Sequence, residues 1–180
     1  MEVRPARVNE KDALARLFVR ARNGMTYVPP VPEEHVGLIA DDLFTRNEDV
    51  WLAEENGHLL GFFAIRRSRT NDWETLERLY VEPNEQGRGI GTALLDKAKA
   101  LRREGLYLWV FQKNTGAIRF YERHGFRLVK LTDGEDNMER EPDALYAWIP
   151  SPGPGRAASG RGSSARSRAA GSRSCPRRSP

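Results

Sequence analysis

Three glycines at alternate positions stand between an apolar, strand-like segment and an amphipathic helix pattern. They are Gly87, Gly89 and Gly91, after a run that ends at Val81. Glycine lets backbone N–H groups come close to a ligand, and the start of a helix adds partial positive charge. The segment therefore predicts a cradle for an anion of the pyrophosphate type.

Two common phosphate-binding signatures do not fit these glycines. The Walker loop needs a Lys directly after its last glycine, and Thr92 follows Gly91 here. The dinucleotide fingerprint needs the spacing G-x-G-x-x-G and an acid after the next strand, where this chain has Gln112 and Lys113. Both nucleotide interpretations therefore fail on residue detail.

Two segments of the chain resemble signatures of the GNAT superfamily of N-acetyltransferases, in its bacterial single-domain form. Gln86-Gly-Arg-Gly-Ile-Gly91 matches the Q/R-x-x-G-x-G/A signature at a strand-to-helix junction. Asn114-Thr-Gly-Ala-Ile-Arg-Phe-Tyr-Glu-Arg-His-Gly-Phe126 matches the block N-x-x-A-x-x-x-Y-x-x-x-G-F. The two stand in the expected order with a strand between them, and the resemblance spans roughly Arg4 to Ile149.

The resemblance implies acetyl-CoA as co-substrate and an amine as acceptor, either a small molecule, a peptide N-terminus or a lysine. It implies that the pantetheine arm lies along the preceding strand like an added strand, and also contacts Asn114. It implies that the strands on either side of the loop diverge to admit the cofactor. The implied cofactor-binding residues are Leu79, Tyr80, Val81, Gln86, Gly87, Arg88, Gly89, Ile90, Gly91, Thr92 and Asn114.

Two residues are the candidate catalytic groups. Tyr121 follows Asn114 by seven residues, about two helical turns, so both lie on the same side of a helix. In the resembling enzymes this tyrosine lies near the thioester sulfur, which makes Tyr121 the candidate general acid; the alternative is an aromatic that packs beside Phe126. Strand alternation places Glu77 on the face of Val81, which makes it the first candidate base; Glu74, Glu82 or a chain of waters are the alternatives.

Two other functions stay open from the sequence. One is a non-catalytic, regulatory module that binds acyl-CoA, and the other is nucleic-acid binding through a basic C-terminal tail. The acceptor walls are expected in residues 23–32 and 133–142. Acidic residues in and near these segments hint at a cationic amine acceptor.

The remaining pattern predicts helices interleaved with strands, hence a mixed α/β (α+β) fold in one domain. Its sheet is expected to be mixed and mostly antiparallel, flanked by helices, as in GNAT acyltransferases. Asn9 is expected to cap the first helix, and Asn56-Gly57 predicts a hairpin turn. Strands are expected at 3–7, 50–55, 58–67, 73–81, 106–111, 126–130 and 144–149, and helices at 9–22, 33–45, 89–103 and 115–123.

Charge divides the chain into two parts. The net charge is +4, but residues 151–180 hold seven arginines and no acid, so residues 1–150 carry −3. The segment 151–180 contains only Ser, Gly, Ala, Pro, Arg and Cys175, which predicts a disordered tail after a domain at 1–150.

The same composition narrows the class of protein. One cysteine and three dispersed histidines predict neither a disulfide framework nor a metal site. The sequence has no apolar stretch of bilayer length and no secretory h-region, so a cytoplasmic protein without a membrane partner is expected. Whether it forms a homodimer is left open.

Overall fold

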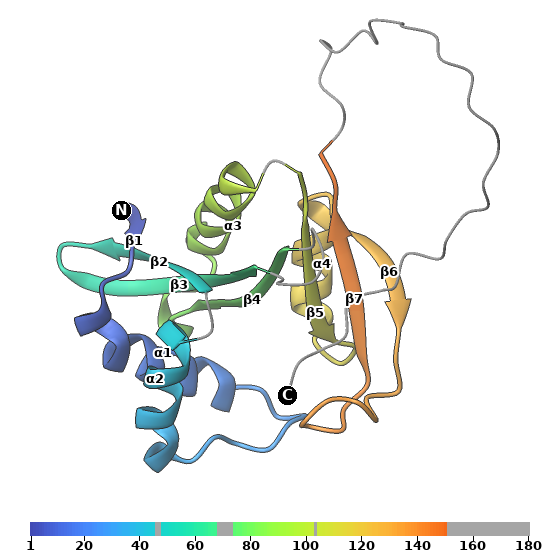
Figure 1. The fold of residues 1–180 in the computed structure, drawn as a ribbon, viewed down its shortest axis with the longest axis horizontal. Helices are drawn as coiled ribbons and strands as arrows, with labels where there is room; N and C mark the ends of the chain where they lie inside the picture. The colour runs from blue at the N-terminus through green and yellow to red at the C-terminus, as the bar shows by residue number, and fades with distance from the viewer. Residues whose placement is uncertain (46–47, 68–73, 103, 151–180) are drawn as a thin grey trace, which may run out of the picture.

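The computed structural model describes residues 1–45, 48–67, 74–102 and 104–150 (Figure 1). The predicted tail at 151–180 and the first residue of the predicted strand at 73–81 lie outside these residues. The strands are β1 (Glu2–Pro5), β2 (Glu48–Glu55), β3 (His58–Arg67), β4 (Glu74–Val81), β5 (Leu106–Phe111), β6 (Arg127–Leu131) and β7 (Asp143–Trp148). The α-helices are α1 (Lys11–Asn23), α2 (Val36–Thr45), α3 (Ile90–Leu101) and α4 (Thr115–Arg123).

The strands form one sheet in the order β1-β2-β3-β4-β5-β7-β6. Every neighbouring pair is antiparallel except β4 and β5, which are parallel. Helices α1 and α2 cover one face of the β1–β4 half, while α3 covers the other (Figure 1). The predicted fold class, a mixed and mostly antiparallel sheet flanked by helices, is confirmed.

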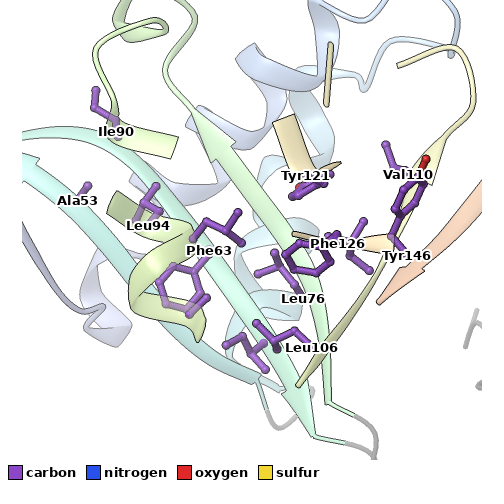
Figure 2. Close-up of a cluster of buried hydrophobic side chains, with 14 of the residues drawn as sticks. Ala53, Phe63, Leu76, Ile90, Leu94, Leu106, Val110, Tyr121, Phe126 and Tyr146 are labelled. Atoms are coloured by element: carbon purple, nitrogen blue, oxygen red, sulfur yellow. The ribbon is translucent and has the colours of Figure 1, made fainter. Parts of the chain in front are cut away.

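Alternation along β3 supplies both layers of the core. Phe62 faces the cluster with α1 and α2, whereas Phe63 faces the cluster with α3, and neither is exposed to solvent. Figure 2 shows the α3 side, where Phe63 lies with Leu94, Leu76 and Leu106. The same cluster continues to Tyr121 and Phe126 and so joins α4 to the sheet.

The first helix begins differently from the prediction. Asn9 does not cap it, because residues Val8–Glu10 form a short 3₁₀ turn and Glu10 is the residue before α1. The Glu10 carboxylate accepts a hydrogen bond from the Arg7 backbone N–H at 2.7 Å and from Arg4 Nη2 at 2.7 Å. These two bonds hold Glu10, and not Asn9, at the entry to the helix.

Three irregularities in the strands have no counterpart in the sequence prediction, one of them in the pairing of β6 with β7 between Leu128 and Lys130. The pairing of β2 with β3 shifts between Ala53 and Glu54, and that of β3 with β4 shifts between Ala64 and Ile65. In the second case Ala64 pairs with Arg78 and Ile65 with Leu76, so Glu77 is the extra residue of a β-bulge. The bulge changes which residues of β4 share a face.

Candidate functional site

The glycine segment forms a loop that leads from the end of β4 into α3. Gly87 and Gly89 both have φ of 81°, a left-handed conformation that side chains with a Cβ rarely adopt. Gly89 is the N-cap of α3, and a Cβ on either glycine would meet open space. Within the described residues, the backbone N–H groups from Gly87 to Thr92 have no hydrogen-bond acceptor. They form a set of free donors at the positive end of a helix.

The side chain of Arg88 is not a free cation, because acidic side chains already pair with it. Its guanidinium forms ion pairs with Glu85 and, at 3.0 Å, with Glu55, and these hydrogen bonds raise the pKa of Arg88. An anion at the loop would therefore meet the backbone N–H donors in preference to the Arg88 guanidinium.

Beside the loop, the sheet is open between β4 and β5. Among the described residues the two strands share a single registered pair, Thr75 with Tyr107. The Glu82 N–H donates to the Leu60 carbonyl at 2.8 Å, which fixes the alternation along the end of β4. Because Gly61 pairs with Val81, the N–H and C=O groups of Val81 and Leu79 point away from β3, toward the side of β5. This edge could pair with an extended ligand.

The backbone groups of Tyr80 do not face the opening, in contrast to the prediction. Tyr80 was expected to offer backbone groups to the ligand, but by the same alternation its N–H and C=O bond with Phe62 on β3. Its ring lies on the α1 face, edge-on to Phe18 with centroids 4.9 Å apart. Burial raises the pKa of the Tyr80 hydroxyl, and the positive charge of Arg22 partly offsets this.

The expected position of Glu77 is wrong, because strand alternation is interrupted at the bulge. Glu77 does not continue the face of Leu79 and Val81. Its carboxylate accepts a hydrogen bond from Arg66 Nη2 at 2.6 Å. Arg66 pairs across the sheet with Thr75 and Glu48, so this carboxylate joins a charged group beside α2.

Helix α4 carries Asn114 and Tyr121. Asn114 is the N-cap, and its Oδ1 accepts a hydrogen bond from the Ala117 N–H at 3.1 Å. This capping role was not predicted from the sequence, and it leaves the amide NH₂ of Asn114 as its donor to a ligand. Tyr121 is 9% exposed and packs edge-on against Phe120 and Phe126, at centroid distances of 5.3 and 5.6 Å.

The hydroxyl of Tyr121 is a protonated donor at neutral pH. Burial, together with the nearby Tyr80 hydroxyl, raises the pKa of Tyr121 above the ordinary value of 10. No hydrogen bond joins this hydroxyl to another described residue. A methyl group built on Gly91 would lie 3.6 Å from the Phe120 ring and 3.8 Å from Val81. The glycine loop, the end of β4 and α4 thus meet around one place.

On the other side of this place, the end of α1 and the β6–β7 connection meet. Arg22, in the last turn of α1, donates from Nη2 to Glu139 Oε1 at 3.2 Å. Tyr27, from the connection between α1 and α2, lies edge-on to Phe111 of β5 with centroids 6.0 Å apart. The two expected acceptor walls, 23–32 and 133–142, therefore approach one another here. Arg22 was missed, although an arginine four residues after Phe18 continues the apolar face of α1.

Most acids that hinted at a cationic acceptor have internal partners. Asp41 pairs with Lys11, Asp42 with Arg78, Glu33 with Arg16, Glu139 with Arg22 and Glu141 with Lys113. Their negative charge is largely neutralised within the protein. The described residues include no group of three or more His, Cys, Asp or Glu placed to hold a metal ion.

A model of the acetyltransferase (GNAT) family matches residues 13–126, which include the glycine loop, β4, β5 and α4. The chain belongs to the GNAT acetyltransferase family. It is 40% identical over 110 residues to the peptidyl-lysine N-acetyltransferase YiaC of Escherichia coli, covering 61% of this chain and 67% of that one. It is 34% identical over 103 residues to a streptothricin acetyltransferase of Streptomyces lavendulae, covering 54% of each.

These alignments span about half to two thirds of the curated relatives. Among solved structures, the fold is similar to the PaiA N-acetyltransferase of Thermoplasma acidophilum in complex with coenzyme A. The TM-score is 0.64 at 19% identity, and the match covers 82% of this chain and 98% of that one. This GNAT chain has, in its described ranges, no helix with the length and apolar character that spanning a bilayer requires.

Proposed function

We propose that this GNAT chain transfers the acetyl group of acetyl-CoA directly to a primary amine. The observation that carries the proposal is the free edge of β4, at Leu79 and Val81, next to a glycine loop with free N–H groups. An extended arm with two amides fits the first, and a pyrophosphate fits the second. Family membership and the coenzyme A bound to the PaiA structure support the same ligand.

In this proposal each part of the ligand has its own protein partners. The backbone of residues 87–92 holds the pyrophosphate, with Gln86 at the entry to the loop. Leu79 and Val81 pair with the pantetheine arm, and the Asn114 amide donates to it. The Val81 N–H, directed into the opening, is placed to donate a hydrogen bond to an oxyanion.

Acetyl-CoA, when bound, supplies an acyl group activated as a thioester, which an amine can attack. Tyr121 keeps its proton at neutral pH and is proposed to give it to the sulfur of the departing thiol. A thiol with a pKa near ~8.5 is already a tolerable leaving group, so this proton adds to the rate without being indispensable.

Glu77 is not proposed as the base for the amine, because it lies off the face of Leu79 and Val81 and its carboxylate is paired with Arg66. A lysine amine with a pKa of ~10.4 is almost fully protonated at pH 7, whereas an α-amine near ~7.8 is neutral in about one molecule in seven. An acceptor of the second kind needs little help from a base. We therefore favour an α-amine as acceptor, while the relation to YiaC supports a lysine. The cytoplasmic location, the domain limits 1–150 and a homodimer stay predictions.

The test is calorimetric titration of the full chain with acetyl-CoA, CoA and ATP. We expect Kd values of roughly micromolar, about −8 kcal/mol, for the first two and no binding of ATP. Gly89→Asp should abolish this binding, because it places a charge and a side chain against the phosphates.

Gly57→Asp is the matched control for Gly89→Asp. Gly57 has φ of 78° in the β2–β3 turn, and a Cβ there also meets open space. This variant therefore brings the same charge and similar backbone strain at a distance from the loop, and should bind normally. Equal affinities of the two variants for acetyl-CoA would contradict the cradle.

A further inference from the structure

The wall between α1 and the β6–β7 connection holds a cationic side chain that is only partly used. Arg22 is 5% exposed, and its Nη2 donates to Glu139 at 3.2 Å. Its Nη1 is buried and has no hydrogen-bond partner. A buried guanidinium N–H without an acceptor is unfavourable, so this atom marks a place where an oxygen would bind well.

A second unused donor lies beside the same aromatic ring. The Tyr27 hydroxyl is buried and has no partner, and burial raises its pKa, so that it holds its proton. The Tyr27 ring lies 6.0 Å from the Phe111 centroid, and the Arg22 guanidinium carbon lies 5.8 Å from it. The two donors therefore flank one residue of β5, the strand on the far side of the opening.

Charge at this wall is balanced. Arg22 is paired with Glu139, and Lys113 is paired with Glu141 at 2.9 Å. A neutral ligand oxygen is consequently as acceptable as an anionic one. Two N–H or O–H donors without acceptors favour an oxygen with free lone pairs over an alkyl group. The buried acceptor at this wall, Glu141 Oε1, has Lys113 as its counter-ion.

The wall also influences the candidate acid electrostatically. The positive charge of Arg22 and the hydroxyl of Tyr27 both act on the Tyr80 hydroxyl, and Tyr80 in turn acts on Tyr121. Arg22 and Tyr27 lie where the two expected acceptor walls approach one another, so an oxygen bound by them would belong to the acceptor.

We propose that Arg22 and Tyr27 form a subsite for a carbonyl or carboxylate oxygen adjacent to the acceptor amine. The acceptors are then α-amino carbonyl compounds, either free amino acids and their amides or the N-termini of peptides. This inference rests on the proposed acetyl transfer and narrows its acceptor. It agrees with the Arg66-bound state of Glu77, because an amine beside a carbonyl has a low pKa and needs little base.

The test offers the full chain and acetyl-CoA three acceptor pools and follows release of CoA thiol and the mass of the products. One pool holds amino acids, their amides and peptides with free N-termini. Comparison of its members shows whether the oxygen comes from a free amino acid or amide, or from a peptide N-terminus. The second holds peptides with blocked N-termini and free lysines. The third holds alkyl monoamines and polyamines that match the first pool but lack the carbonyl. We expect kcat/KM to be at least about tenfold higher in the first pool.

Tyr27→Phe then removes one donor and little else. For the preferred acceptor we expect KM to rise about five- to tenfold with kcat nearly unchanged, and acetyl-CoA affinity to stay the same. Arg22→Lys, which keeps the charge opposite Glu139 but loses the second N–H, should act in the same direction. Tyr146→Phe is the control, since that hydroxyl donates to Glu122 away from this wall.

The outcomes separate the two proposals. Turnover of alkyl amines or blocked lysine peptides as fast as the first pool, or an unchanged KM in Tyr27→Phe, overturns the subsite and leaves acetyl transfer standing. No CoA release in any pool overturns the transfer itself, and the subsite with it.

Discussion

Tyr121 combines a buried ring with a hydroxyl that bonds to none of the described residues. Neighbouring aromatics account for the ring, because Phe120 and Phe126 pack against it edge-on. They do not account for the hydroxyl, since phenylalanine would pack equally well. The proposed acid role gives the oxygen a purpose and can be tested without disturbing the core.

Tyr121→Phe should lower kcat by about 10- to 100-fold, at or below the lower limit of the usual range for general acid catalysis, because a thiolate leaves fairly well unaided. Acetyl-CoA affinity should be almost intact. Tyr146→Phe removes another tyrosine hydroxyl from the same core and should leave kcat alone. Steady-state kinetics of both variants with calorimetric Kd values decides; an unchanged kcat in Tyr121→Phe removes it from the mechanism.

The pH dependence follows from the same residue. Burial raises the pKa of Tyr121 above 10, so its acid form persists through the range in which the acceptor amine loses its proton. We expect kcat/KM to rise with pH up to the pKa of the amine and to stay level until pH ~10. A fall below pH 9 that Tyr121→Phe abolishes would contradict the raised pKa.

At the scale of elements, α4 shows one residue with two separable roles. Asn114 caps the helix through Oδ1 and has its NH₂ left for the ligand. Asn114→Asp keeps a capping oxygen, so it should retain stability but weaken acetyl-CoA binding. Asn114→Ala should weaken binding too and also lose about 0.5–2 kcal/mol of unfolding free energy. Thermal unfolding and calorimetry on both variants separate the roles; equal stability would show that the cap contributes nothing.

The strands and helices were predictable because their signals are local. Asn56-Gly57 marks the hairpin, and both residues have the positive φ that such a turn requires, 51° and 78°. The bulge at Glu77 was not predictable, since no glycine or proline marks it and its cause is pairing with another strand. That one inserted residue overturned the expected face of Glu77 and shows how alternation fails across a bulge.

The residues of the candidate site likewise fall into those that local sequence predicts and those that it does not. Gly87, Gly89, Asn114 and Tyr121 stand in contiguous motifs and could be read directly. Arg22 and Glu139 are far apart in the chain and form a pair only through the tertiary fold. The acids around the acceptor walls could not be interpreted from the sequence for a related reason. Whether their negative charge is available to a ligand depends on ion pairs with cations elsewhere in the sequence.

For the whole molecule, the opening between β4 and β5 leaves an interrupted sheet across which the ligand is proposed to lie. A ligand that binds only the folded state stabilises it by mass action. Acetyl-CoA at 100 times its Kd should raise the free energy of unfolding by about 2.7 kcal/mol. Thermal melts at increasing acetyl-CoA measure this, with the Gly89→Asp variant as the unresponsive control; equal shifts in both would show that the stabilisation comes from elsewhere.

That only Thr75 and Tyr107 are in register between β4 and β5, among the residues the structure describes, also bears on cooperativity. Few described bonds join β1–β4 to β5–β7, although the two halves share a core that includes Phe63 and Leu106, so we expect this seam to open locally before the whole molecule melts. Proteases cut such open states, and their population falls as the substrate binds. The lifetime of this protein would then follow the supply of acetyl-CoA, so that the enzyme persists when its substrate is plentiful and is cleared when the substrate is scarce.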